Sequence, residues 1–210
     1  LGCKVNQYDT QGIRERFVNA GFKEIDNGSK AGIYVINTCT VTSSADRKSR
    51  YFIHYAYRQN PKARIIVTGC YTALDSDEIA KIPGVTHIIK NQDKNRIVEL
   101  LNELNGHNEL PACRQAGTSA SDIGISNFSG HTRAFLKIQD GCNNNCSYCK
   151  VPLVRGASRS KPLSEIIREA DRLVKNGFKE IVLCGICLGS YGKDLPVPID
   201  PVDVIEALEK

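Results

Sequence analysis

Two patterns of apolar residues alternate over the first hundred positions of the chain. A continuous apolar run at residues 33–36 is typical of a short strand buried on both faces of a sheet, and the stretches at residues 64–67 and 85–89 give further strand signals. Apolar residues at helical spacing recur before, between and after these runs. The helices that this spacing predicts cover residues 9–20, 44–59, 76–81 and 93–104. Strands that alternate with helices predict an α/β domain built on a parallel sheet.

A second α/β pattern occupies the last eighty residues. A strand-like stretch at residues 133–139 is followed by a helical stripe at 163–175, which Asn176-Gly177 ends, and then by a buried strand at 180–183. This order predicts the first βαβ unit of a partial (βα) barrel, in which chemistry belongs at the carboxyl ends of the strands. A last helical pattern begins at residue 201.

The predicted domains are residues 1–104, an amino-terminal parallel-sheet domain, and residues 131–210, the truncated start of a barrel domain. Residues 105–130 are rich in Gly, Ser and Asn with little periodicity, so we interpret them as a linker. Cys113 lies in this linker and is predicted to be a free thiol. Because the chain contains no methionine, we expect it to be a fragment of a longer protein.

Composition narrows the class of protein. A hydrophobic content of 41% and a charged content of 24% are ordinary for a globular domain, and no apolar run is long enough to cross a membrane. Nine cysteines are an odd number and are not spaced as in a small secreted scaffold, which favours reduced thiols and a cytoplasmic location. The net charge of +5 is compatible with an anionic partner such as RNA.

Three cysteines, Cys142, Cys146 and Cys149, form a C-x₃-C-x₂-C run directly after the strand-like stretch at 133–139. Thiolates are the ligands that iron–sulfur clusters require, and three ligands leave one iron of a four-iron cluster open for a substrate or cofactor. A structural zinc site is the alternative, but zinc prefers four ligands, and the nearest histidine, His131, lies upstream of the strand.

A second set of cysteines follows strand-like stretches. Cys39 and Cys70 come just after the runs at 33–36 and 64–67, and Leu1-Gly2-Cys3 looks like the tail of a further strand. The carboxyl ends of parallel strands meet at one edge of a sheet, so the three thiols are candidates for one metal site. The alternative is that these cysteines are small buried apolar residues, as free cysteines often are.

The run at 142–149, with Tyr148 just before its last cysteine, resembles the cluster loop of the radical S-adenosylmethionine (SAM) enzymes. The resemblance implies that these three cysteines bind a 4Fe-4S cluster, whose open iron binds SAM and which cleaves SAM to a 5′-deoxyadenosyl radical. Tyr148 would lie near the adenine of SAM.

Residues 1–10, 37–42 and 68–70 resemble the amino-terminal domain of the radical SAM methylthiotransferases. That family uses two 4Fe-4S clusters, and the resemblance assigns Cys3, Cys39 and Cys70 to the auxiliary cluster that takes part in sulfur transfer. A methylthio group then goes to the substrate. The chain is therefore expected to be the amino-terminal part of an enzyme that transfers sulfur-containing groups, inactive as a fragment.

Residues 3–9 and 45–50 are most similar to the branch that methylthiolates C2 of N6-threonylcarbamoyladenosine in tRNA. The resemblance implies the tRNA anticodon loop as partner, with an electron donor and a sulfur donor that the sequence does not identify. The alternatives are a methylthiotransferase for isopentenyladenosine or a ribosomal protein, and a non-catalytic zinc-binding RNA module.

Several further residues have two interpretations. The basic run at 47–50 has the charge to contact phosphate, or forms a solvated helix face. Arg155 and Arg159 are candidates for binding phosphate or the SAM carboxylate, or are surface residues. Cys184 and Cys187 form a C-x₂-C pair without a metal role, unless Cys184 competes as a fourth cluster ligand.

Overall fold

The chain forms two compact units. The computed structural model describes residues 2–26, 29–104, 124–128 and 130–209. One unit comprises Leu1–Gly2 and Gly12–Ile123, and the other comprises Cys3–Gln11 and Gly124–Lys210. The division falls within helix α1 (Lys4–Asn19), so the segment that begins at Cys3 is part of the second unit. The predicted linker, apart from residues 124–128 and 130, lies outside the described residues, and so does Cys113.

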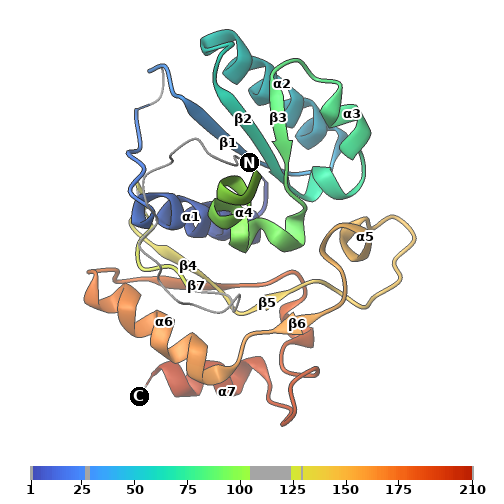
Figure 1. Ribbon diagram of the computed structural model, residues 1–210. Coiled ribbons are helices and arrows are strands. Elements are labelled where there is room, and N and C mark those ends of the chain that lie inside the picture. Colours follow the sequence, from blue (N-terminus) through green and yellow to red (C-terminus); the bar gives the residue numbers. More distant parts are fainter. Residues whose placement is uncertain (1, 27–28, 105–123, 129, 210) are drawn as a thin grey trace. The chain divides into compact units, whose positions relative to one another are not determined.

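The remaining elements follow the order shown in Figure 1. The other α-helices are α2 (Ser43–Gln59), α3 (Ser76–Ala80), α4 (Ile97–Leu104), α5 (Val151–Arg155), α6 (Leu163–Lys175) and α7 (Pro201–Leu208). The strands are β1 (Ile33–Thr38), β2 (Arg64–Gly69), β3 (Val85–Ile88), β4 (Ala134–Lys137), β5 (Gln139–Asp140), β6 (Arg159–Ser160) and β7 (Ile181–Cys184). Short 3₁₀ helices are η1 (Cys70–Ala73), η2 (Asn91–Arg96) and η3 (Leu188–Ser190).

The first unit is a parallel sheet of order β1-β2-β3 with helices on both faces (Figure 1). Alternate residues of β2 point to opposite faces, as the pleat of a strand requires. Ile65 and Val67 pack with Ile53 of α2, whereas Ile66 packs with Ile97 of α4. Burial on both faces explains why the strands appear in the sequence as continuous apolar runs.

The second unit contains the parallel pair β4–β7 and the short antiparallel pair β5–β6. Phe135 packs with Val5 and Tyr8 from the first turns of α1, and Leu136 packs with Ile166 of α6. The β4–β7 pair is therefore covered on one face by the start of α1 and on the other by α6 (Figure 1).

The α/β fold class predicted from the sequence is confirmed, since the long strands pair in parallel and alternate with helices. Three local predictions are wrong. Helix α1 begins at Lys4, not at residue 9, and the described residues Gly2 and Cys3 are not in a strand. The helix expected over 93–104 is divided into η2 and α4. Within the described parts of the chain, no helix is both long and apolar enough to cross a membrane.

Candidate metal centre

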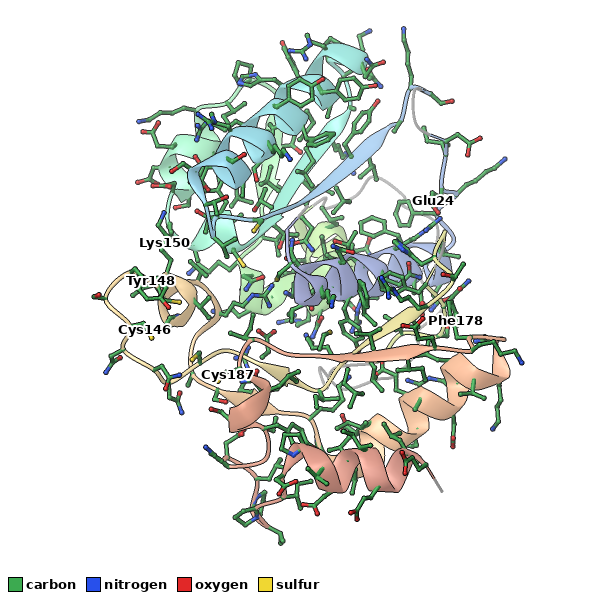
Figure 2. The ribbon with its side chains drawn as sticks, turned by 180° about the vertical axis from the view of Figure 1, so that it is seen from behind. Glu24, Cys146, Tyr148, Lys150, Phe178 and Cys187 are labelled. Atoms are coloured by element: carbon green, nitrogen blue, oxygen red, sulfur yellow. The ribbon has the colours of Figure 1, made fainter. Side chains whose placement is uncertain are left out.

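The cysteine loop, defined here as residues 141–150, connects β5 to α5 at the carboxyl end of the strand-like stretch. Figure 2 shows Cys146 and Tyr148 together on this loop. Cys146 is exposed, Cys142 and Cys149 are half-buried, and Tyr148 is 88% exposed. The three thiols are thus accessible on one loop. None of the eight cysteines in the described ranges is in a disulfide.

The start of the cysteine loop is fixed by backbone contacts. Gly141 has a φ of +71°, and a Cβ atom at this position would lie 2.0 Å from the carbonyl oxygen of Ala157. The N–H of Cys142 donates to the carbonyl oxygen of Gly156 (3.1 Å), and Asp140 pairs with Arg159 in the β5–β6 ladder. Glycine is therefore required directly before Cys142, since a side chain would collide with the returning strand.

The tip of the loop has fewer contacts. The N–H of Cys149 donates to the carbonyl oxygen of Cys146 (3.0 Å), and the N–H of Asn144 points at the sulfur of Cys142 (3.5 Å). Hydrogen bonds to cysteine sulfur are one of the ways in which a protein sets the potential of an iron–sulfur cluster. Across the residues that the structure describes, no three His, Cys, Asp or Glu side chains are gathered around one metal position.

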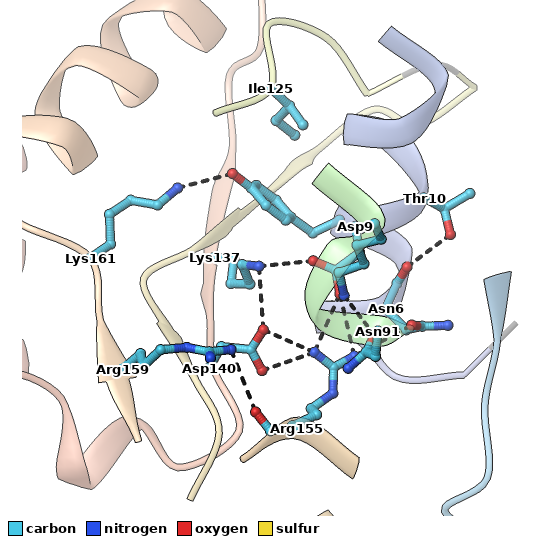
Figure 3. A network of polar contacts seen from close by, with 12 residues as sticks. Asn6, Asp9, Thr10, Asn91, Ile125, Lys137, Asp140, Arg155, Arg159 and Lys161 are labelled. Atoms are coloured by element: carbon cyan, nitrogen blue, oxygen red, sulfur yellow. Dashed lines mark hydrogen bonds and ion pairs between the residues drawn. The ribbon is translucent and has the colours of Figure 1, made fainter. Parts of the chain in front are cut away.

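Four charged side chains form one group of ion pairs at the base of the loop, that is, where the chain enters it after β5 and leaves it through α5. We call these residues the charged quartet: Asp9, Lys137, Asp140 and Arg155. Figure 3 shows Arg155 between the two carboxylates. Its Nη1 lies 2.9 and 3.0 Å from the two oxygens of Asp140 and 3.3 Å from Asp9 Oδ2. Lys137 donates to Asp9 (2.8 Å) and Asp140 (3.4 Å). Two positive and two negative charges balance one another in the interior.

Gln139 of β5 is a second organising residue. Its side-chain nitrogen lies 2.8 Å from the carbonyl oxygen of Gly141 and 2.9 Å from the hydroxyl of Ser158. Its side-chain oxygen accepts the N–H of Cys187 (2.8 Å). One buried amide thus connects the start of the cysteine loop with the segments before β6 and after β7.

In the first unit, Cys39 and Cys70, which we call the sheet-edge pair, follow β1 and β2. Thr38 is the register partner of Gly69, so the two cysteines come after adjacent positions at the carboxyl edge of the sheet. Both are buried. The hydroxyl of Ser49 donates to the carbonyl oxygen of Cys39 (3.2 Å), which ties the end of β1 to helix α2.

Two buried threonines lie next to the sheet-edge pair in the sequence, Thr40 directly after Cys39 and Thr68 two residues before Cys70. The side-chain oxygens of Thr40 and Thr68 are buried and find no hydrogen-bond partner among the described residues. Buried polar atoms of this kind are rare and often belong to a site for a polar or ionic group. With two thiols beside them, this donor set suits a metal–sulfur group. Cys3, the third predicted ligand, is exposed and directly precedes α1 in the second unit.

Cys184 and Cys187 do not behave as a pair. Cys184 is buried at the end of β7, and burial raises the pKa of its thiol to about 12. The raised pKa means that the Cys184 thiol stays protonated at neutral pH when no metal is bound. Cys187 is half-buried, and its sulfur lies 3.3 Å from the hydroxyl of Ser190.

Asp194 supports β6 from the other side of the loop base. Its carboxylate accepts the N–H of Ser160 (2.8 Å) and the hydroxyl of Ser160 (2.6 Å). Burial by itself raises the pKa of Asp194, but these hydrogen bonds lower it, and the net result is a pKa below the usual value.

The two interpretations of Arg155 are both corrected. Its side chain is neither at the surface nor directed at a ligand, because it is buried and hydrogen-bonds Asp9 and Asp140. Arg159 is exposed, and its guanidinium donates to the carbonyl oxygen of Arg155 (3.4 Å). A signal for the quartet was present in the sequence: a lysine, Lys137, stands in an otherwise apolar strand and needs a buried partner.

The two halves of the chain match different family models. Residues 1–108, more than half of the chain, match the family described as "Uncharacterized protein family UPF0004". The chain belongs to the UPF0004 family. Residues 136–196, which include the cysteine loop, match the radical SAM superfamily.

Curated relatives of this UPF0004 protein include five named threonylcarbamoyladenosine tRNA methylthiotransferase MtaB, among them those of Bacillus subtilis and Aquifex aeolicus. The protein of Bacillus subtilis is 43% identical over 93% of this chain, and that of Aquifex aeolicus is 38% identical over 92%. A tRNA-2-methylthio-N(6)-dimethylallyladenosine synthase of Clostridium tetani is 32% identical over the whole chain. These relatives confirm the predicted resemblance to the radical SAM methylthiotransferases. The chain spans 44–49% of their length, about half.

A solved structure agrees on the fold. TsrM, a radical S-adenosylmethionine methyltransferase from Kitasatospora setae, superposes with a TM-score of 0.51 and 13% sequence identity. The match covers 85% of this chain and 39% of TsrM. At this identity the likeness concerns the fold alone.

Proposed function

We propose that the whole protein transfers a methylthio group to C2 of N6-threonylcarbamoyladenosine in tRNA. One observation carries the proposal. Five relatives named as threonylcarbamoyladenosine tRNA methylthiotransferases are 34–43% identical to this chain, whereas three named as dimethylallyladenosine synthases are 29–32% identical. The second reaction is the alternative that these lower identities leave.

Cys142, Cys146 and Cys149 are the residues that would hold the 4Fe-4S cluster, and Tyr148 would contact SAM. The cluster and SAM together supply the radical and methyl chemistry when bound. The chain's own contribution is to present three thiols on an accessible loop whose start is held by the Cys142–Gly156 backbone hydrogen bond. The exposed ring of Tyr148 is available for stacking on an adenine.

Cys39 and Cys70, together with Cys3, would hold the auxiliary cluster that takes part in sulfur transfer. The register of β1 and β2 supports the first two ligands, because it brings the sheet-edge pair to adjacent strand ends. The unpartnered hydroxyls of Thr40 and Thr68 support a polar group at this edge. Cys3 is assigned through the resemblance of residues 1–10 to the family motif.

The tRNA anticodon loop is the proposed partner, in the cytoplasm. The outer face of α2 has the chemistry for such a contact. Arg47 and Lys48 are exposed there, Tyr51 is 56% exposed, and its ring lies 5.4 Å from that of Phe52 and 6.3 Å from that of Tyr55. Cationic side chains beside exposed rings suit a single-stranded nucleic acid, which offers phosphates and unstacked bases together.

The test uses tRNA from a strain that lacks the whole gene. We expect mass spectrometry of its nucleosides to find threonylcarbamoyladenosine without its 2-methylthio form. Complementation with the full-length gene restores the modification, whereas Cys142→Ala and Cys70→Ala do not. Cys187→Ala is the matched control, since this half-buried cysteine lies outside both proposed ligand sets and should complement fully. Retained 2-methylthio-threonylcarbamoyladenosine in the deletion strain would refute the proposal, and loss of the isopentenyl derivative instead would favour the second reaction.

The metal content of the full-length protein distinguishes the proposed iron–sulfur enzyme from the alternative of a non-catalytic zinc-binding RNA module. Reconstitution of the full-length protein with iron and sulfide without oxygen should give a coloured sample with about eight irons per chain, as two four-iron clusters require. A sample that stays colourless and retains zinc would overturn the assignment of both cysteine sets, because zinc has no such absorption.

A further inference from the structure

The charged quartet lies at both ends of the cysteine loop. Asp140 directly precedes Gly141, and its Oδ1 accepts the N–H of Gly141 (2.8 Å). Arg155 is the last residue of α5, the helix that follows the loop, and its carbonyl oxygen accepts from Arg159 (3.4 Å). The ion pair between Asp140 and Arg155 therefore joins the two ends of the segment that contains Cys142, Cys146 and Cys149.

The same pair is connected to the first turns of α1. Asp9 accepts from Lys137 through Oδ1 (2.8 Å) and from Arg155 through Oδ2 (3.3 Å). Asn6, one turn earlier, accepts from Arg155 Nη2 (3.4 Å). The side chains of Asp9 and Arg155 are each 2% exposed, so this contact is formed away from water (Figure 3).

Burial makes the geometry of the quartet specific. A buried charge that loses its partner is strongly destabilising, so four side chains are constrained to one arrangement. The planar fork of Arg155 contacts two carboxylates and an amide at once, which the point charge of a lysine does not reproduce. The arrangement fixes the base of the loop, whereas its tip is exposed.

We propose that Asp140 and Arg155 are positioning residues for the cysteine loop, and that Asp9 and Lys137 hold this pair in place through their own contacts with it. The quartet sets the place of Cys142, and the tip then closes around a cluster from a fixed base. This inference rests on the proposed function to the extent that the loop binds a cluster. The fixed base itself is a property of the metal-free protein.

The second unit offers a matched control. Lys161 and Glu169 form another buried ion pair (2.6 Å), with side chains 4% and 1% exposed. Their contacts are the hydroxyl of Tyr8 and the N–H of Ile125. Glu169→Gln thus disturbs an ion pair of similar burial in the same unit without a direct contact to the cysteine loop. Tyr8 is a neighbour of both charged groups, since Lys137 Nζ lies 5.2 Å from the centre of its ring.

The experiment uses the full-length protein with Cys39→Ala and Cys70→Ala, so that the cluster of the cysteine loop is measured alone. Asp140→Asn and Arg155→Lys are expected to release iron to a chelator about tenfold faster, the lower end of the range for residues that orient metal ligands. The electron paramagnetic resonance spectrum of the reduced cluster should change as well. Glu169→Gln should lower the melting temperature without altering either readout.

Equal release rates and unchanged spectra in all variants would overturn the positioning role. If Asp140→Asn fails to fold, Arg155→Lys decides, because it keeps the buried charge. If the full-length protein with Cys39→Ala and Cys70→Ala binds no iron, the proposed function fails. Hydrogen exchange of the Cys142 amide in the metal-free protein then tests whether the quartet positions the start of the loop. Faster exchange in Arg155→Lys than in Glu169→Gln supports the positioning role, and equal exchange refutes it.

Discussion

The sheet-edge pair and the cysteine loop present thiols in opposite ways. Cys39 and Cys70 are buried at the ends of paired strands, so the ladder determines where they lie. Cys146 is exposed on a loop tip, and only the base of that loop is fixed. A feature common to both is a glycine with positive φ directly before a cysteine, at Gly69 and at Gly141.

The two sites therefore differ in whether the backbone fixes the positions of the thiols and in whether the thiols are accessible to solvent. At the sheet edge the backbone places the thiols in advance, and the proposed metal group would have to reach a buried position. On the loop Cys146 is exposed and accessible, and the start of the loop is the part that backbone contacts hold. A closed, buried position is typical of a structural metal site, whereas catalytic metal sites keep one position open for a ligand besides the protein.

Alkylation of the metal-free protein gives the largest expected contrast. Cys146 should react with iodoacetamide at least about a thousandfold faster than Cys39, because a buried thiol reacts only after local or global opening. That ratio corresponds to about 4 kcal/mol of opening free energy. Cys184 is the control, since it is buried and its pKa is raised to about 12, and it should also stay unmodified at pH 8. Rapid labelling of Cys39 would remove the contrast; pulse labelling with mass spectrometry measures it.

Alanine at the two glycines should damage one site each. Gly69→Ala and Gly141→Ala are expected to cost about 1–3 kcal/mol from backbone strain alone. A Cβ atom would also lie 2.3 Å from Thr38 O in the first and 2.0 Å from Ala157 O in the second. Hydrogen exchange should accelerate near Cys70 in one variant and near Cys142 in the other.

Gly177→Ala is the matched control for this pair. Gly177 also has a positive φ, but a Cβ atom there meets nothing within 4 Å. Gly177→Ala should therefore lose free energy of unfolding from backbone strain alone, without the additional loss from a steric collision. If all three variants lose the same free energy of unfolding, close backbone approach does not distinguish the two cysteine sites.

The smallest of the expected effects is a loss of free energy of unfolding in acid, through the contact between Asp194 and Ser160 of β6. The folded-state pKa of Asp194 is below the usual 3.8, so its stabilising effect is complete above that value and is lost as the pH falls through the lower folded pKa. Since the residue is largely exposed, we expect about 0.5 kcal/mol or less. The measurement is the free energy of unfolding from pH 5 to pH 2. Ser160→Ala should flatten this dependence, and a dependence unchanged by Ser160→Ala would exclude the contact as its source.

The regular elements were predictable because their cause is local. The continuous apolar runs became β1 and β2, and the stripe from Leu163 became α6 with the expected ends. The sequence also predicted Cys39 and Cys70 at neighbouring strand ends, which the parallel register bears out.

The first turns of α1 and the charged quartet were missed because their causes are distant in the sequence. Lys137 and Asp9 are 128 residues apart, and no local pattern connects them. Val5 and Tyr8 have helical spacing, but two apolar residues are too few to predict a helix, and their packing partner Phe135 comes much later. Arg155 was interpreted from its chemistry alone, which does not report burial.

The hydrogen bonds of Gln139 bear on how the cysteine loop can be moved into other proteins. Its one amide contacts Gly141, Ser158 and Cys187, which belong to three separate segments. A cysteine loop transplanted into another barrel without the turn that contains Cys187 would leave the side-chain oxygen of Gln139 without the N–H that it now accepts. Chimaeras should therefore exchange residues 139–160 and the turn after β7 together.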